Sequence, residues 1–182
     1  AARFALPVGR TPDGGPARVD LTATPALALH GQRRADIARA ILLACLNPHA
    51  RPDAPGPLAH VVIAAADAAD LLDNDLPSLP SPPGLHIVDD IDTALDELEH
   101  WPQHGHGAPP PLVPLVLIAT APPAETDPAE RLRQILTNRR RRVAAVLLGD
   151  WPTLATVHTT PDATIPATTT YPILPIGTKL FT

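Results

Sequence analysis

Residues 26–46 read ALALHGQRRADIARAILLACL. The apolar run 26–30, followed by Gly31, predicts a β-strand that ends in a turn. Residues 35–46 are apolar on nearly every side, which is typical of a helix buried in the centre of a domain. This stretch therefore predicts a strand, a turn and a central helix in direct succession.

The segments before this stretch predict a β-hairpin. Residues 3–8 and 17–21 are short apolar runs, and the connector between them, residues 11–16, reads TPDGGP. Glycine and proline in such a connector favour a reversal of the chain direction. We therefore expect an N-terminal antiparallel hairpin.

The segments after this stretch alternate between apolar runs and helical patterns. The apolar runs predict strands at residues 60–65, 85–88, 112–119 and 143–148, and short edge strands at 155–159 and 179–181. The segments between them predict helices at 67–72, 93–100 and 127–138, the second capped by Asp90 or Asp92 and the third by Asp127. Fully apolar strands that alternate with helices indicate a parallel sheet. The predicted fold class is α/β, with a mostly parallel sheet and helices on both of its faces.

The composition is typical of one globular domain. The chain has 182 residues, of which 45% are hydrophobic and 3% aromatic, so its core must consist of Ala, Val, Leu and Ile. The 25 prolines cluster between the apolar runs, where a fixed φ and a missing N–H donor do little damage. Because the sequence contains no methionine, even at position 1, we expect residues 1–182 to be a single domain of a longer protein.

Charge, hydropathy and cysteine content exclude several classes of protein. A net charge of −5 and a pI of about 5.8 provide no domain-wide positive field, so direct binding of nucleic acid is not expected. No apolar run reaches the ~18 residues of a membrane helix, and no signal peptide is recognisable. The single cysteine, Cys45, lies in the apolar helix and fits a reducing compartment. We expect a cytoplasmic domain without membrane contact.

Short motifs follow one another along the chain in a characteristic order. The first group comprises Leu6–Gly9, Gly14–Pro16, Val19–Leu21, Pro25 and Ala28–Gly31. The second group comprises Val61–Ala65, Ile87–Asp90 with helix 93–100, Leu115–Ala119 and Val146–Pro152. The first group resembles the entry into the phosphate loop of FtsK/HerA-like P-loop ATPases, and the second resembles their later strands, including the Walker B and sensor strands. The resemblance covers nearly the whole chain and implies a P-loop NTPase-like fold.

At the position of the phosphate loop, the residues that this resemblance requires are missing. A working loop needs several glycines, a Lys on the β/γ-phosphates and a Ser or Thr on Mg²⁺. The sequence offers Gly31, Gln32, Arg33, Arg34, Ala35 and Asp36 instead. Asp36 puts a negative charge at the helix N-terminus, where phosphate should bind. Substitution of the Lys by Arg33 or Arg34 is the alternative that would preserve nucleotide binding.

The Walker B position lacks its acidic residues as well. The segment Leu117–Pro122 contains no carboxylate that would hold Mg²⁺. Asp150 follows the last core strand and is misplaced for this task, but with Thr120 and Trp151 it is a candidate for a crevice at the carboxyl ends of the strands. A Trp151 that packs as a lid over an empty site is the alternative. The sequence predicts no catalysis, no metal and no bound cofactor.

Histidines and arginines outside these motifs favour structural roles. His86, His100, His104 and His106 lack both a cysteine partner and the His-Glu-x-x-His spacing of a zinc site. Arg139, Arg140, Arg141 and Arg142 extend a basic cluster with Arg131 and Arg133, which either complements a helix dipole or contacts an anion or an acidic partner. Residues 87–90 resemble the acidic pocket of receiver domains, but their place in the middle of the chain favours helix capping.

The resemblance and the missing residues together imply a degenerate ATPase domain. Such domains occur in actinobacterial multidomain regulators and as extra ATPase-like modules of type VII secretion motors. We expect a non-catalytic regulatory, sensor or docking domain of an actinobacterial transcriptional regulator, which binds a protein partner, a neighbouring domain of the same chain or a small ligand. The alternatives are a nucleotide-binding ATPase domain of a DNA-translocation or type VII secretion motor, and a structural spacer.

Overall fold

The computed structural model describes residues 4–50, 55–72, 81–101, 113–138, 142–151, 154–167 and 174–181. Six strands form one sheet in the order β5-β4-β6-β7-β3-β8, and every neighbouring pair is parallel. Their bounds are β3 Ala26–His30, β4 His60–Ala64, β5 Leu85–Val88, β6 Leu115–Thr120, β7 Val143–Leu148 and β8 Ala155–His158. The predicted α/β class with a mostly parallel sheet is confirmed.

Helices cover both faces of this sheet, which explains why its strands are apolar without alternation. The helices are α1 Arg34–Leu46, α2 Ala65–Leu71, α3 Ile91–His100 and α4 Asp127–Thr137. In β6, Val116 and Ile118 belong to the core that contains α1 and α2. The intervening residues Leu117 and Ala119 belong to the core that contains α3 and α4. Strand β6 therefore supplies side chains to two separate cores, as do β3, β4 and β7.

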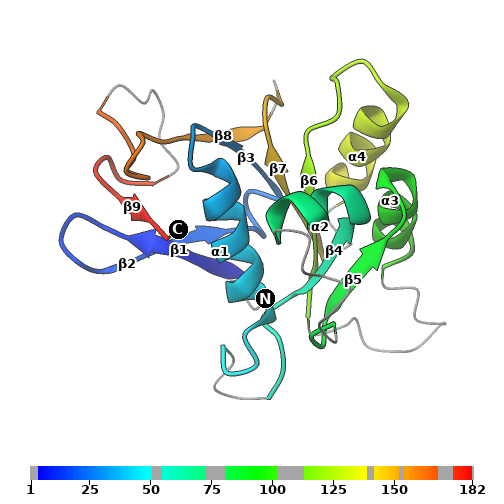
Figure 1. Ribbon diagram of the computed structural model, residues 1–182, viewed down its shortest axis with the longest axis horizontal. Coiled ribbons are helices and arrows are strands. Elements are labelled where there is room, and N and C mark those ends of the chain that lie inside the picture. Colours follow the sequence, from blue (N-terminus) through cyan, green and yellow to red (C-terminus); the bar gives the residue numbers. More distant parts are fainter. Residues whose placement is uncertain are drawn as a thin grey trace.

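A second, antiparallel sheet packs on the outer side of α1 (Figure 1). It has the order β2-β1-β9, with β1 Ala5–Arg10, β2 Pro16–Asp20 and β9 Lys179–Leu180. The predicted N-terminal hairpin is confirmed, whereas the last strand pairs with this hairpin and not with the main sheet. A Cβ at Gly9 would lie 2.2 Å from the Lys179 carbonyl oxygen, so a glycine is needed where β9 approaches β1.

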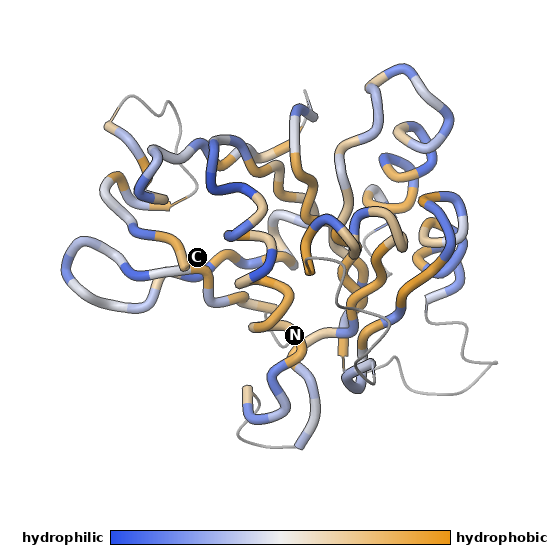
Figure 2. Tube along the Cα trace, in the orientation of Figure 1, coloured by the Kyte–Doolittle hydropathy of each residue, from blue (hydrophilic) through white to orange (hydrophobic). Residues whose placement is uncertain are grey.

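Helix α1 lies between the two sheets, and its side chains that face them are buried, as predicted. Ile41 and Leu42 are 2% and 1% exposed. Figure 2 shows hydrophobic residues along the strands and this helix, and hydrophilic residues in most of the turns. Leu43, in contrast, is 63% exposed, so the prediction of a helix buried on all sides is wrong at this position. Two sheets cover two sides of a helix and leave a strip of it open.

The caps of α3 and α4 differ in how well they were predicted. Asp90 caps α3, because its Oδ1 accepts a hydrogen bond from Thr93 N at 2.8 Å, and the hydrogen bonds from Thr93 lower the pKa of this carboxyl. Asp127 is not the N-cap of α4. The helix begins at Asp127, its N-cap is Thr126, and the Thr126 hydroxyl donates to the Pro123 carbonyl oxygen at 2.7 Å.

Candidate functional site

The turn between β3 and α1 occupies the place predicted for a phosphate loop. Gly31 has φ of 109°, which strains any residue with a side chain. A Cβ at this position would lie 2.8 Å from both the carbonyl oxygen and the hydroxyl oxygen of Thr159. The Thr159 hydroxyl also donates to the His30 carbonyl oxygen at 3.3 Å. Gly31 is therefore required for close packing of the segment that follows β8.

The first turn of α1 carries its own ion pairs. Asp36 Oδ2 lies 2.6 Å from Arg33 Nε, and its other oxygen lies 3.1 Å from Arg39 Nη1. Arg39 Nε donates to the Leu71 carbonyl oxygen at 2.7 Å, which connects this turn to the end of α2. Gln32 and Arg34 are exposed. The position where phosphate would bind thus holds a carboxylate that accepts hydrogen bonds from two guanidinium groups.

Two histidines and Asp150 meet at the adjacent carboxyl ends of β7, β3 and β8. His30 Nε2 lies 3.0 Å from Asp150 Oδ1, and the His30 ring stacks on His158 with 4.9 Å between centroids. Asp150 is a predicted crevice residue, whereas the sequence analysis overlooked both histidines. Part of the signal was available, because His30 is the last residue of the predicted strand 26–30 and His158 lies one residue before the end of the predicted strand 155–159. In the structure, the parallel register pairs His30 with His158.

Thr120 and Trp151 do not join this group. The Thr120 hydroxyl donates to Asp67 Oδ1 at 2.8 Å, and its backbone N–H donates to Asp67 Oδ2 at 3.3 Å. A carboxylate therefore does lie at the end of β6, where the Walker B residues were predicted, but it comes from α2. Trp151 is 3% exposed and belongs to the core under α3 and α4. Its burial leaves little of its surface for contact with a ligand.

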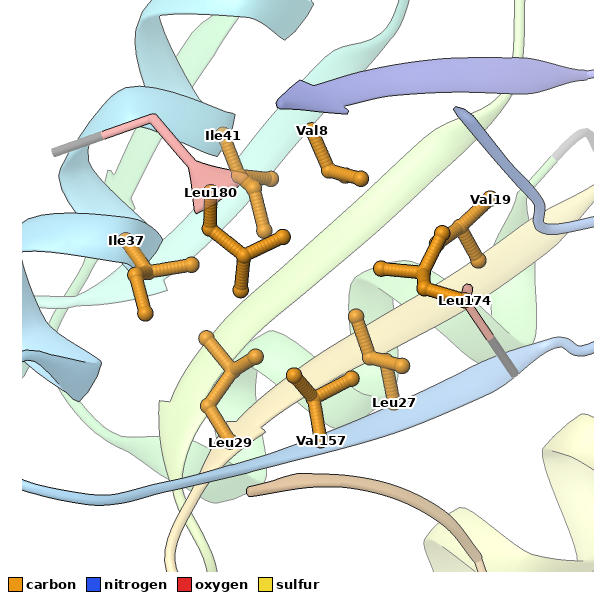
Figure 3. Close-up of a pocket in the computed structure, with 9 residues that line it drawn as sticks. All are labelled: Val8, Val19, Leu27, Leu29, Ile37, Ile41, Val157, Leu174 and Leu180. Atoms are coloured by element: carbon orange, nitrogen blue, oxygen red, sulfur yellow. The ribbon is translucent and has the colours of Figure 1, made fainter. Parts of the chain in front are cut away.

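The space between the two sheets is filled by aliphatic side chains (Figure 3). They come from both sheets, from α1 and from the C-terminal segment: Val8, Val19, Leu27, Leu29, Ile37, Ile41, Val157, Leu174 and Leu180. The gap between them is too narrow to hold a water molecule. This region is part of the core and offers no room for a ligand.

The predicted basic cluster is described only in part. Arg139, Arg140 and Arg141 lie outside the described residues, and the Arg142 carbonyl oxygen accepts a hydrogen bond from Leu115 N at 3.0 Å. Arg131 pairs within the chain with Asp92, Asp96 and Glu99 of α3. Hydrogen bonding to Asp96 is the main cause that raises the pKa of Arg131. Arg131 thus holds α4 against α3.

At the amino ends of β4 and β5, which form the opposite edge of the large sheet, His86 lies next to His60. The sequence analysis did not single out His60. His60 Nδ1 lies 3.3 Å from His86 Nε2, and His86 Nδ1 lies 3.0 Å from Glu97 Oε2. Burial, and then the charge of His86, lower the pKa of His60. His100 instead contacts the Asp96 carbonyl oxygen at 2.7 Å, and His104 and His106 lie outside the described residues.

The described residues give little support to a metal cluster of three or more side chains, to a reactive cysteine or to a membrane helix. No group of three or more His, Cys, Asp and Glu side chains in it is arranged to hold a metal ion. Burial raises the pKa of the Cys45 thiol to about 12, which keeps it protonated and unreactive near neutral pH. None of the helices in the described ranges has the length and hydrophobicity to cross a membrane.

No family model and no curated protein matches the sequence. The structure is similar to EccC (ATPases 2 and 3) of Thermomonospora curvata in complex with a signal sequence peptide, with a TM-score of 0.49 and 14% identity over 85% of this chain and 29% of that chain. It is also similar to the cytoplasmic domain of the type VII secretion ATPase EccC from the same organism, with a TM-score of 0.48 and 14% identity over 86% and 19% of the two chains. For EssC (ATPases 2 and 3) from Geobacillus thermodenitrificans the TM-score is 0.45 and the sequence identity 14%, over 86% of this chain and 29% of that chain. This chain spans less than a third of each of these structures, and similarity at this level assigns no activity to it.

Proposed function

We propose that this chain is a non-catalytic regulatory or docking domain on an ATPase-like scaffold. One observation carries the proposal: the place of the phosphate loop is filled by the protein's own groups. Thr159 packs on Gly31, and Asp36 binds the side chains of Arg33 and Arg39. A phosphate bound there would displace Thr159 and lie next to the Asp36 carboxylate.

The Walker B position supports the same proposal. Phosphoryl transfer needs a metal ion that neutralises charge on the β- and γ-phosphates. The carboxylate nearest to the end of β6 belongs to Asp67, and both of its oxygens accept hydrogen bonds from Thr120. ATP hydrolysis therefore lacks both the phosphate clamp and the metal ligand.

The exposed side of the carboxyl edge offers polar groups for contact with a protein. Gln32, Arg34 and Asp150 are exposed around the turn, and protein interfaces use such groups at their rims. We assign this edge to a protein partner or to a neighbouring domain of the same protein. The Ala-, Pro- and Arg-rich composition suits a GC-rich actinobacterial genome, and a transcriptional regulator from such a genome is the context we propose.

A specific observation favours the alternative of nucleotide binding. Arg34 lies in the first turn of α1 and is exposed. Its backbone N–H donates to the Gly31 carbonyl oxygen at 3.4 Å, but its guanidinium makes no hydrogen bond or ion pair with another described residue. Its guanidinium is free to contact a phosphate group, as the Lys of a working loop does. An ATPase domain of a DNA-translocation or type VII secretion motor is therefore the second candidate function.

An assay of ATP turnover with a restored variant separates these two functions. Arg34→Lys combined with Ala35→Thr reinstates the Lys and the Thr of a phosphate loop but leaves Asp36 and Thr159 in place. We expect no turnover above background for either the natural chain or this variant. Turnover in the natural chain that is lost in Arg34→Ala would replace our proposal with the ATPase alternative.

The docking role is tested by amide hydrogen exchange of the longer gene product against the isolated 182-residue chain. We expect slower exchange at residues 31–36 in the longer product, because a docked domain covers this edge. The hairpin turn at residues 11–16 is the internal control and should exchange equally fast in both. Equal exchange at residues 31–36 would contradict docking by a neighbouring domain at this edge.

A further inference from the structure

The amino edge of the large sheet assembles two histidines, a carboxylate and a tryptophan. His60 opens β4 and is on the same face of the strand as Val62, because side chains alternate with a period of two. In the parallel register His86 of β5 pairs with Val62. Val62 faces α3 and α4, so both histidines lie on the face where α3 supplies Glu97 and Trp101.

The two imidazoles have the spacing of ligands to one metal ion. His60 Nδ1 and His86 Nε2 are 3.3 Å apart. Two histidine nitrogens at about 2.0–2.1 Å from a tetrahedral zinc ion are separated by about 3.3–3.4 Å. The ring centroids are 5.5 Å apart with an angle of 65° between the ring planes, so the rings meet at their edges and do not stack. The nitrogen atoms need little movement to share an ion.

Glu97 gives His86 the hydrogen bond that metal-binding histidines commonly have. Its Oε2 lies 3.0 Å from His86 Nδ1, which places the proton of a neutral His86 on Nδ1 and leaves the Nε2 lone pair directed at His60. A carboxylate on the second ring nitrogen fixes the tautomer of a ligand and increases its basicity. The side chain of His86 is 34% exposed, so an ion has access from solvent.

We propose that His60 and His86 form a two-histidine site for a divalent transition-metal ion, with Glu97 as the positioning residue and water in the remaining coordination positions. Imidazole nitrogen suits Zn²⁺, Ni²⁺ and Cu²⁺ and is a poor ligand for Mg²⁺ and Ca²⁺. Without metal, His60 donates its Nδ1 proton to His86 Nε2. On binding, the proton of His60 moves to its Nε2 through solvent, and the freed Nδ1 lone pair binds the ion.

Trp101 provides a local reporter for this site. Its ring lies 5.1 Å from the His60 ring and 6.3 Å from the His86 ring. Cu²⁺ bound between the two imidazoles should quench Trp101 fluorescence, whereas Trp151 lies in the core at the other edge of the sheet. A Trp101→Phe variant should therefore lose most of the quenching and keep its affinity for the ion.

Calorimetric titration with Ni²⁺, Cu²⁺ and Zn²⁺ chlorides tests the proposal on the 182-residue chain. We expect one ion per chain, tightest for Cu²⁺ in keeping with the general order of affinity. His60→Gln and His86→Gln should each lower the affinity more than tenfold. Glu97→Gln, which leaves both ligands in place, should lower it by about 10-fold to 100-fold. His158→Gln, which removes a histidine of the other pair, should have the affinity of the natural chain.

Two results would overturn the proposal. One is that His60→Gln and His86→Gln both bind the metal ion as tightly as the natural chain does, provided that thermal melting without metal shows both variants to be folded. The other is loss of binding in a His104→Gln/His106→Gln double variant, which would assign the ion to those two histidines. If either glutamine variant at position 60 or 86 is unfolded, the Glu97→Gln titration decides, and an unchanged affinity there contradicts the proposed site.

Discussion

The two edges of the large sheet carry similar side chains in different arrangements. At the carboxyl edge His30 Nε2 lies 3.0 Å from Asp150 Oδ1, and Arg33 pairs with Asp36, so each of these carboxylates has a nitrogen partner. At the amino edge Glu97 contacts His86, and His86 contacts His60. The last of these contacts joins two imidazoles, whereas each contact at the carboxyl edge joins a carboxylate to a nitrogen group. Parallel sheets usually bind ligands at the carboxyl edge, yet here the polar groups at that edge contact one another.

The position of a site in a fold and its use are therefore separate properties. The strand, Gly31 and α1 lie where the sequence analysis predicted a phosphate loop, but Gly31 is explained by its contact with Thr159 and by its φ. The presence of this glycine thus has a packing reason. The following predictions test whether the carboxyl edge is structural and the amino edge is accessible.

The largest effect is expected from the two tryptophans, one near each edge. Trp151→Ala should destabilise the protein by about 3–5 kcal/mol, because a fully buried aromatic side chain is replaced by a cavity. Trp101 is only partly buried, and its Nε1 is buried without a hydrogen-bond partner among the described residues. Trp101→Ala should therefore destabilise less, as measured by urea unfolding. Equal losses of free energy of unfolding in the two variants would contradict the view that the carboxyl edge is structural and the amino edge accessible.

A smaller effect is expected at Gly31. Gly31→Ala should destabilise by about 1–3 kcal/mol from backbone strain, and the contact with Thr159 should add about 1 kcal/mol or more. Gly14→Ala is a matched control, because Gly14 also has a positive φ, of 85°, but no atom lies within 4 Å of its added Cβ. If urea unfolding shows the same loss of free energy of unfolding for both variants, the contact between Gly31 and Thr159 contributes nothing to the stability of the turn.

The smallest effect on stability is expected at Asp36. Asp36→Asn removes ion pairs that are partly exposed, so it should change the free energy of unfolding by less than about 1 kcal/mol. The same change removes the negative charge beside Arg33 near the N-terminus of α1. We expect inorganic phosphate to raise the melting temperature of this variant more than that of the natural chain. Asp92→Asn is the control, since Arg131 keeps its contacts with Asp96 and Glu99.

The fold was predictable where hydrophobic periodicity is strong. The strand ending at His30, Gly31 and the helix after it follow from a continuous apolar run and a local turn signal. The pairing of β9 with β1 was not predictable, because a two-residue strand has no periodicity and its partner lies at the other end of the chain. The cap of α4 was misplaced by one residue, since Thr126 and Asp127 are both common N-cap types.

The candidate sites were predictable only where sequence neighbours form them. Asp36 and Arg33 share one helical turn, so their proximity follows from spacing alone. His60 and His86 are 26 positions apart, and their contact depends on the register between β4 and β5 and on the approach of α3. Asp67 and Thr120 are 53 positions apart and meet for a similar reason. A single sequence contains no direct signal for such contacts.

Thermal melting with Mg-ATP measures binding at the β3–α1 turn without requiring turnover, so it decides whether this turn is closed to nucleotide. A ligand at a hundredfold excess over its dissociation constant stabilises by about 2.7 kcal/mol, which corresponds to a rise of roughly 5–10 °C for a chain of this size. Our account predicts no shift at millimolar Mg-ATP. A Mg²⁺-dependent rise of this size that disappears in Arg34→Ala would contradict it.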